Sequence, residues 1–284
     1  MKLYTIETGY FKLDGGAMFG VVPKSLWQRT NPADENNLCT WAMRSLLVEY
    51  DNKLILIDTG IGNKQSDKFF KNYHLHGDDS LQKSINSLGY SHNEITDVIL
   101  THLHFDHCGG SVVFNKEIND YEVAFTNANY WTSEKHWDWA TNPNSREKAS
   151  FLKENILPIK KSGRLNLIQG EGKLFKNISV FFANGHTESQ TIPIIEYKEK
   201  KIVFMADLLP SVGHIPLAYV MGYDTRPLIT LDEKRKFLNE AADKNYILFL
   251  QHDPNVECCT VKHTDKGVRV NQKFTLSDFL RNKI

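Results

Sequence analysis

Runs of apolar residues between polar turns dominate the sequence and predict many short strands. Residues 2–11 (KLYTIETGYF) alternate loosely between apolar and polar side chains, which is the pattern of a half-buried strand. Residues 40–50 (TWAMRSLLVEY) and 54–60 (LILIDTG) are apolar runs on either side of a polar turn at 51–53, so they predict a β-hairpin. Residues 79–90 instead place apolar side chains at helical spacing before a glycine, which predicts a helix.

Further strands are predicted in both halves of the chain, and helices follow several of them. Residues 127–157 are helical and aromatic in pattern, with a break at 142–144, and residues 230–245 also predict a helix. The other runs that predict strands are 95–105, 121–126, 165–175, 177–186, 191–197, 201–207 and 246–253. Two sheets packed face to face with helices outside satisfy this alternation, so the sequence predicts the α/β class.

Length and composition are those of one large globular domain. The chain has 284 residues, of which 41% are hydrophobic and 24% charged, so it can bury a sizeable core. No internal repeat, low-complexity tract or linker interrupts the sequence, which predicts a single domain over residues 1–284. The 34 basic residues balance the 34 acidic ones without a basic stripe, which argues against a nucleic-acid partner.

The N-terminal segment and the cysteines bear on location. The segment MKLYTIETGYFKLDGG contains no apolar h-region, and no stretch approaches the roughly 18 apolar residues of a membrane span. We therefore expect neither a signal peptide nor a transmembrane helix. Four cysteines in a chain of this length do not form a disulfide framework, which favours reduced thiols and a cytoplasmic protein.

A cluster of metal-ligand side chains lies at residues 101–110, THLHFDHCGG. In an extended segment residues i and i+2 point the same way, so His102 and His104 can converge on one ion. Asp106 and His107 are adjacent and share a face only if the chain turns there, for instance into a helix at Asp106. Clustering this many imidazoles has no packing advantage, whereas zinc, iron and manganese bind imidazole and carboxylate. The cluster therefore predicts two half-sites.

Each half-site needs ligands from elsewhere, and three later strands supply candidates at their ends. ISVFFANGH ends in His186, IVFMAD ends in Asp207, and YILFLQH ends in His252. Any one of these residues taken singly is more often a capping or core residue than a ligand. Three in succession at strand ends indicate a site, because α/β proteins build their sites there.

The segments HxHxDH, GHTESQ, MADLLP and QHD, preceded by LILIDTGIG at 54–62, resemble the metallo-β-lactamase superfamily over nearly the whole chain. The resemblance implies a four-layer αββα sandwich, in which two mixed sheets carry helices outside and a binuclear metal site lies at the sheet ends. The implied ligands are His102, His104 and His186 for one ion, Asp106, His107 and His252 for the other, and Asp207 as a bridge beside a hydroxide. True β-lactamases of the family lack this aspartate, which argues against antibiotic hydrolysis.

Residues 14–24, DGGAMFGVVPK, resemble the N-terminal segment of quorum-quenching lactonases of the YtnP type, which are relatives of the acyl-homoserine lactonases. The apolar residues at 18–22 predict either a pocket for an acyl chain or a hairpin packed on the core. Several homoserine lactonases have a tyrosine three residues after the bridging aspartate, where this chain has Pro210. Tyr223 and His214 are the candidate catalytic residues that replace it.

The predicted reaction is the opening of an N-acyl-homoserine lactone ring by a metal-bridging hydroxide. Two divalent ions, zinc first with iron, cobalt and manganese as alternatives, polarise the carbonyl and generate the hydroxide. Asp106 carries the proton to the leaving oxygen. Asp58 is predicted either to orient a ligand histidine or to form a turn before Thr-Gly.

Other functions use the same ligands and stay open. They are hydrolysis of a phosphotriester or aryl ester, a thioesterase of the glyoxalase II kind, and a ligand-binding effector with little turnover. The expected partner is a small lactone or ester, with no nucleic acid and no membrane. A homodimer also stays open.

Overall fold

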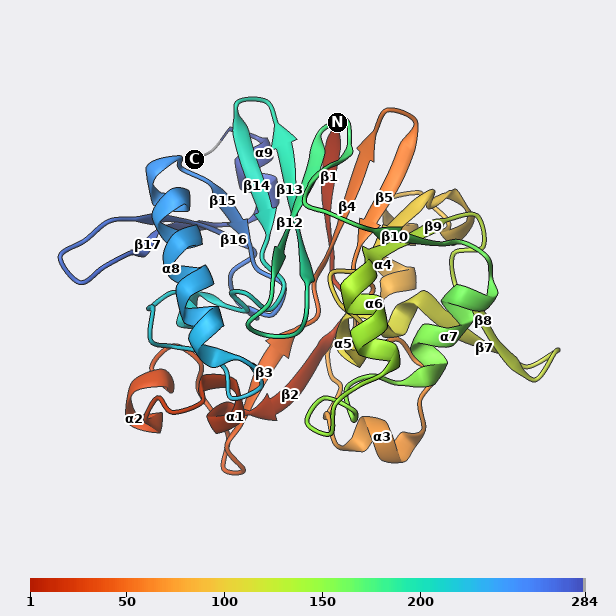
Figure 1. The fold of residues 1–284 in the computed structure, drawn as a ribbon, viewed down its shortest axis with the longest axis horizontal. Helices are drawn as coiled ribbons and strands as arrows, with labels where there is room; N and C mark the ends of the chain where they lie inside the picture. Colours follow the sequence, from red (N-terminus) through yellow and green to blue (C-terminus); the bar gives the residue numbers. More distant parts are fainter. Residues whose placement is uncertain (283–284) are drawn as a thin grey trace. The chain divides into compact units, whose positions relative to one another are not determined.

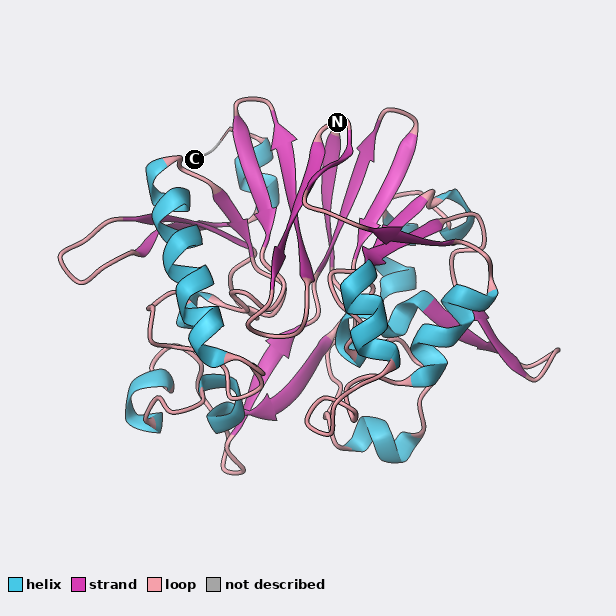
Figure 2. Cartoon of the chain, in the orientation of Figure 1, coloured by secondary structure: helices cyan, strands magenta, loops and turns pink. Residues whose placement is uncertain are grey.

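The computed structural model describes residues 1–282 and divides into two compact units (Figure 1). The first unit comprises Met1–Tyr10 and Met43–Gly170, and the second comprises Phe11–Ala42 and Glu171–Ile284. Strands and helices occur in both units (Figure 2). The single domain over residues 1–284 stays a prediction.

The first unit is built on a six-stranded sheet with the order β1-β4-β5-β6-β9-β10. Its strands are β1 (Lys2–Ile6), β4 (Ser45–Tyr50), β5 (Lys53–Ile57), β6 (Asp97–Ile99), β9 (Asn129–Ser133) and β10 (Leu165–Ile168). β4 and β5 form the predicted hairpin, in which Asp51 and Asn52 turn the chain with φ angles of 54° and 59°. Asp and Asn tolerate this left-handed conformation. β5, β6, β9 and β10 are parallel, so their carboxyl ends meet at one edge of the sheet.

Five helices and several smaller elements accompany this sheet in the described part of the first unit. They are α3 (Asp67–Lys71), α4 (Leu81–Ser87), α5 (Phe105–Cys108), α6 (Glu134–Thr141) and α7 (Lys153–Lys161), with the 3-10 turns η1 (His92–Glu94) and η2 (Gly109–Ser111) and a hairpin of β7 (Val112–Asn115) and β8 (Asp120–Val123). α4 contacts β1, and α6 contacts β9 and β10. One apolar core that includes Leu47, Val98, Phe125 and Tyr130 fills the unit and holds the sheet edge in place.

The second unit is built on a seven-stranded sheet in which spatial order follows the sequence. Its strands are β11 (Gly172–Phe175), β12 (Ile178–Ala183), β13 (Gln190–Tyr197), β14 (Lys200–Phe204), β15 (Ile247–Phe249), β16 (Cys258–Lys262) and β17 (Arg269–Phe274). β12 and β14 are both antiparallel to β13, and β15 is parallel to β14. β12, β14 and β15 therefore run in one direction and end at the same edge.

Helix α8 (Pro227–Asp243) is the long helix of the second unit and packs against β16 (Figure 1). Proline suits its first position, where the backbone N–H has no partner within the helix. The unit also contains α9 (Leu276–Leu280), the 3-10 turn η3 (Val212–His214), and the N-terminal elements α1 (Gly15–Phe19), α2 (Lys24–Trp27) and β3 (Leu38–Ala42). Strand β2 (Tyr10–Asp14) also lies here except for Tyr10, which belongs to the first unit.

Several stretches differ from the sequence-based predictions. Residues 2–11, predicted as one strand, belong to β1 and the start of β2, and residues 40–50 belong to the end of β3 and to β4. Residues 165–175 are two strands rather than one, because the chain leaves the first sheet after β10 and enters the second at Gly172, whose φ of 124° suits glycine. Trp131, predicted in a helix, lies on β9, where aromatic and β-branched neighbours favour a strand. Residues 15–19 form helix α1 instead of a hairpin, and Asp14 caps it by accepting a hydrogen bond from the backbone of Ala17.

Lys234 is a buried lysine of α8 whose Nζ donates to the carbonyl oxygens of Pro216, Leu217 and Tyr219 at 3.3, 3.2 and 2.6 Å. Lys234→Met keeps the apolar stem but removes this donor, so we expect the free energy of unfolding to fall by about 3 kcal/mol. Urea denaturation measures it. Lys236→Met, at an exposed position of the same helix, is the control and should cost less than about 0.5 kcal/mol. Equal losses in the two variants would contradict the role of Lys234.

Within residues 1–282, no helix has the length and apolar character that crossing a bilayer requires. All four cysteines are buried free thiols, as the sequence predicted.

Candidate metal centre

The first unit carries four of the predicted ligands just beyond the end of β6. Asp58 follows β5 directly, and Thr101 and His102 follow β6. Because β5 and β6 are parallel and pair Ile57 with Ile99, the two strand ends lie side by side. Polar residues from separate parts of the sequence therefore meet at this sheet edge.

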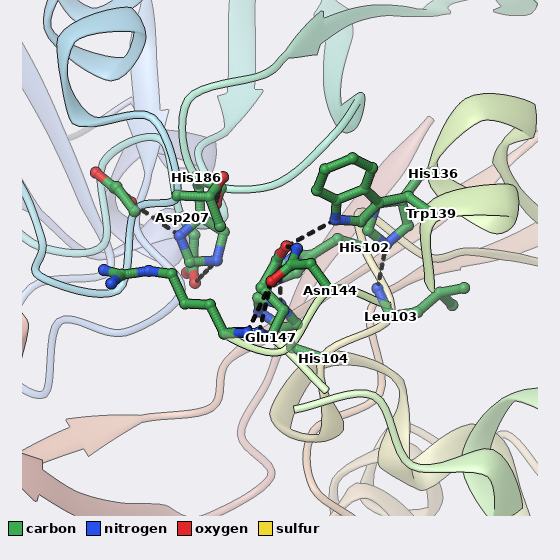
Figure 3. Close-up of polar contacts among 12 residues, drawn as sticks. His102, Leu103, His104, His136, Trp139, Asn144, Glu147, His186 and Asp207 are labelled. Carbon is green, nitrogen blue, oxygen red and sulfur yellow. Dashed lines mark hydrogen bonds and ion pairs between the residues drawn. The ribbon is translucent and has the colours of Figure 1, made fainter. Parts of the chain in front are cut away.

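His102 and His104 point toward one another (Figure 3). His102 Nε2 lies 3.0 Å from His104 Nδ1, and both rings are buried. The backbone of His104 is extended, with φ −64° and ψ 150°, and the chain enters α5 immediately after it. An i, i+2 pair in extended backbone thus presents two imidazole nitrogens to one point.

Asp106 and His107 lie together on α5. The helix begins at Phe105, one residue before the predicted start, and brings Asp106 Oδ2 to 3.6 Å from His107 Nε2. The rings of His102 and His107 have their centroids 3.8 Å apart. The two half-sites predicted from the sequence are therefore neighbours within this unit.

Asp58 combines the two roles that the sequence left open. Its φ of 57° places it in a tight turn, and its side chain is fully buried. Oδ1 accepts from the backbone N–H of Thr101 at 2.8 Å, while Oδ2 accepts from the Thr101 hydroxyl at 2.7 Å and lies 3.0 Å from His107 Nδ1. The carboxylate accepts a hydrogen bond from the protonated Nδ1 of His107, so Nε2 of this histidine carries no proton and can bind a metal.

In the second unit, the other three predicted ligands follow the ends of strands β12, β14 and β15. His186, Asp207 and His252 each lie three residues past the last residue of their strand. The parallel register pairs Phe204 with Phe249, so Asp207 and His252 leave the sheet at equivalent positions. The three side chains are buried and gather at this edge of the sheet.

Asp207 lies between the two histidines of this unit. Its Oδ2 is 3.0 Å from His186 Nε2 (Figure 3), and its Oδ1 is 3.0 Å from His252 Nε2. Each carboxylate oxygen therefore faces a different imidazole. A carboxylate placed in this way can offer one oxygen to each of two ions.

Hydrogen-bond acceptors orient both histidines of the second unit. Asp224 Oδ1 lies 2.9 Å from His186 Nδ1, and the carbonyl oxygen of Ala42 lies 2.7 Å from His252 Nδ1. Both rings thus keep Nε2 for the site. Asp224 had no predicted role, and the only available signal was its place at the end of the segment MGYD, residues 221–224. Ala42 contributes a backbone atom, and side-chain patterns carry no signal for it.

The charge around His186 is strongly negative. Burial disfavours its charged form, but the carboxylates of Asp207 and Asp224 outweigh burial and raise the pKa of His186 to about 10. A metal ion that takes Nε2 therefore displaces a proton, and metal binding at this residue releases protons.

The two candidate catalytic residues outside the ligand set have different surroundings. His214 is buried: its Nε2 donates to the carbonyl oxygen of Met18 at 2.8 Å, and its Nδ1 lies 2.9 Å from the Ser211 hydroxyl. Both ring nitrogens are therefore engaged in contacts within the protein, which supports a positioning role for His214. Burial lowers the pKa of His214 to about 3. Tyr223 is 41% exposed. Catalysis by either residue stays a prediction.

The ligand-type atoms within each unit have the spacing that a metal needs. Two ligands at about 2.0–2.1 Å from a tetrahedral zinc ion lie roughly 3.3 Å from each other. The four pairs within the units are 3.0, 3.6, 3.0 and 3.0 Å apart. Imidazole nitrogen with carboxylate oxygen is a donor set for zinc, iron and manganese. The residues present therefore fit metal ions.

Comparisons with known proteins agree with this chemistry. Residues 44–252 match the model of the metallo-beta-lactamase superfamily. An N-acyl homoserine lactonase of Bacillus thuringiensis is 23% identical over 269 residues, which cover 89% of this chain and 93% of that protein.

Two solved structures share the fold over almost the whole chain. The crystal structure of a probable metal-dependent hydrolase from Staphylococcus aureus has a TM-score of 0.87 and 28% identity, covering 96% of both chains. AidC, a dizinc quorum-quenching lactonase solved in complex with a product, has a TM-score of 0.76 and 25% identity over 96% of this chain and 95% of AidC. These matches confirm the predicted fold class and the predicted kinship with homoserine lactonases. By its family match and its fold, this chain belongs to the metallo-β-lactamase superfamily and is a hydrolase of that superfamily.

Proposed function

We propose that the protein is a binuclear metal hydrolase that opens the ring of N-acyl-homoserine lactones. The proposed ligands are the seven residues implied by the family resemblance: His102, His104, Asp106, His107, His186, Asp207 and His252. The observation that carries the proposal is Asp207, whose two oxygens each lie 3.0 Å from a different histidine. A carboxylate in this position can serve two ions.

Relatives support the substrate class. The Bacillus thuringiensis relative is an N-acyl homoserine lactonase, and AidC is a quorum-quenching lactonase solved with a product N-acyl-homoserine. Both align with about nine-tenths or more of this chain. We therefore propose a lactone as substrate and, because AidC is a dizinc enzyme, zinc as the metal.

The chain's own residues have distinct tasks in this reaction. When bound, the ions supply a hydroxide nucleophile at neutral pH and polarise the substrate carbonyl. Ring opening forms a bond from water oxygen to the acyl carbon, breaks the ring C–O bond and leaves a carboxylate and an alcohol. The alcohol oxygen needs a proton, which Asp106 carries on its carboxylate. Asp58 and Asp224 keep His107 and His186 oriented throughout.

Contacts with the substrate outside the ligand set are proposed for Tyr223. Pro210 replaces the tyrosine of several homoserine lactonases, and its carbonyl oxygen accepts a hydrogen bond from the backbone of His252 at 3.1 Å. Pro210 thus supports the proposed ligand His252 through its backbone, and it has no hydroxyl group that could contact the substrate. Of the two predicted substitutes, Tyr223 is partly exposed and His214 is buried, so Tyr223 is the better candidate. A cytoplasmic location and a homodimer stay predictions.

The test compares three substrates on one preparation. Metal-replete protein is assayed side by side on a long-chain acyl-homoserine lactone, an aryl ester and an organophosphate triester, with product formation followed by chromatography. We expect the highest kcat/KM on the lactone. Chelator-treated protein is the control, and it should lose this activity and regain it when zinc is added back.

Each other outcome assigns a different function. A triester rate far above the lactone rate would replace the lactonase proposal by a phosphotriesterase. Faster turnover of the aryl ester would indicate an arylesterase. Two bound ions per chain with no turnover of any substrate would indicate a ligand-binding protein.

A further inference from the structure

Glu147 lies in the segment between α6 and α7, beside Asn144 and Trp139 (Figure 3). Its carboxylate is buried, with the side chain 4% exposed. Oε2 accepts hydrogen bonds from Trp139 Nε1 at 2.7 Å and from Asn144 Nδ2 at 2.6 Å. The Asn144 side chain also accepts from the backbone N–H of Glu147 at 3.1 Å. With Oε2 held by two donors, the direction of Oε1 is fixed as well.

The second oxygen of Glu147 faces His104. Oε1 lies 3.5 Å from His104 Nε2, which is ion-pair distance and longer than the roughly 2.7–3.2 Å of an N–H···O hydrogen bond. The other ring nitrogen, His104 Nδ1, lies 3.0 Å from His102 Nε2. The imidazole of His104 is therefore placed between a carboxylate on one side and the neighbouring histidine on the other.

Backbone contacts hold His104 in this place. The N–H of Phe105 donates to the carbonyl oxygen of Ser150 at 3.0 Å, so the segment that carries Glu147 is tied to the residue after His104. The N–H of Leu103 donates to His136 Nε2 at 2.8 Å and fixes the residue before it (Figure 3). The separation of Glu147 from His104 is thus set by the fold rather than by one flexible side chain.

The other four histidines of the proposed ligand set share one feature, an acceptor at the ring nitrogen that is not offered to the metal. These acceptors are Thr101 Oγ1 for His102, Asp58 Oδ2 for His107, Asp224 Oδ1 for His186 and Ala42 O for His252. In each case the acceptor faces Nδ1. For His104 the geometry is reversed, and the carboxylate faces Nε2.

We propose that Glu147 is the positioning residue of His104, accepting the proton of Nε2 in a hydrogen bond so that Nδ1 is presented to the metal. A neutral imidazole carries one proton, and the nitrogen that binds metal must be without it. An acceptor at Nε2 therefore selects the tautomer with a bare Nδ1 and makes that nitrogen more basic. The proposal rests on the metal site assigned under the proposed function.

The test is Glu147→Gln. Trp139 and Asn144 both donate to one oxygen of Glu147, so they hold the amide oxygen of glutamine there and turn its N–H₂ toward His104. A donor then faces Nε2 where an acceptor stood. We expect zinc affinity, measured by competition with a chromogenic chelator, to fall about 10- to 100-fold. In ¹⁵N-histidine-labelled zinc protein, the His104 signal should lose the pattern of a protonated Nε2 and a metal-bound Nδ1.

Matched variants separate positioning from folding. Glu117→Gln removes the same charge at an exposed turn and should leave zinc affinity and the His104 signal unchanged. Glu147→Asp keeps a carboxylate acceptor, although its shorter side chain places it farther from His104, and this variant should bind zinc more tightly than Glu147→Gln. If Glu147→Gln does not fold, Glu147→Asp is the variant to compare with the wild type. Unchanged affinity and an unchanged His104 tautomer in the glutamine variant, or equal affinities in the two Glu147 variants, would overturn the proposal. Wild-type protein that binds no zinc would instead contradict the proposed function itself.

Discussion

Asp207→Ala is expected to release both ions and to lower lactone hydrolysis by at least about a thousandfold, because metal supplies the nucleophile at neutral pH. Asp207 offers Oδ2 to the position of His186 and Oδ1 to that of His252, each at 3.0 Å. Loss of this one side chain therefore removes a negatively charged ligand from both proposed ions. Elemental analysis after gel filtration gives the metal content, and chromatography of the opened lactone gives the rate.

Two further variants make the Asp207 result specific. Asp265→Ala removes an exposed carboxylate from the same unit and should keep both metal and activity. Asp207→Asn keeps the shape of the side chain but not its charge, and it should also lose metal because a neutral amide is a weaker ligand for a divalent ion. If Asp207→Ala keeps two tightly bound ions, the bridging assignment is wrong.

Asp58→Ala is expected to lower the free energy of unfolding by about 3–5 kcal/mol and to weaken zinc binding about 10- to 100-fold. Its carboxylate accepts from the backbone and the hydroxyl of Thr101 and faces His107 Nδ1, all in the buried interior. Alanine leaves these donors without their acceptor. It also adopts the left-handed φ of 57° less readily than aspartate, which adds a backbone free-energy cost. Urea denaturation of metal-depleted protein measures stability, and chelator competition measures affinity.

The two effects of Asp58 can be separated. Asp51→Ala makes the same change at an exposed turn residue with φ of 54°, so it measures the backbone cost alone. Asp58→Asn keeps Oδ1 for the backbone of Thr101 but turns an N–H₂ toward His107, and it should weaken zinc binding with a smaller loss of stability. If Asp58→Ala and Asp51→Ala lose equal stability and bind zinc equally well, Asp58 is only a turn residue.

Strand positions were predictable where the alternation or run of apolar side chains corresponded to a single strand in a single sheet. The hairpin of β4 and β5 follows from two apolar runs around an Asp-Asn turn, and local sequence decides such a turn. Residues 165–175 were assigned wrongly because periodicity does not say which sheet a strand joins. Trp131 was assigned wrongly because strand pairing in the folded chain overrides the local helical pattern. The short helix α1 depends on the cap by Asp14, which the apolar pattern does not reveal.

By itself, the sequence determined which residues are ligand candidates and where they lie on their strands. His102 and His104 follow one strand, while His186, Asp207 and His252 follow three others, and parallel strand direction brings such ends together. This was predictable because imidazole and carboxylate clusters have chemical meaning at the level of residue type, and because side chains in extended backbone alternate with a fixed period.

Only the tertiary structure decided how each ligand is oriented. The acceptors that fix the imidazole rings are a turn carboxylate, Asp58, an aspartate before α8, Asp224, a backbone carbonyl at Ala42 and, by our proposal, Glu147. Apart from Thr101 beside His102, these groups are distant in sequence from the histidines that they serve. The sequence indicated only Asp58 among them, as one of two alternatives, because it lies in the DTG segment. The chemistry of the others is common to many surface and capping residues, so residue type does not mark them. A hydrogen bond depends on distance and direction within a fraction of an ångström, and only the packing of the chain sets these quantities.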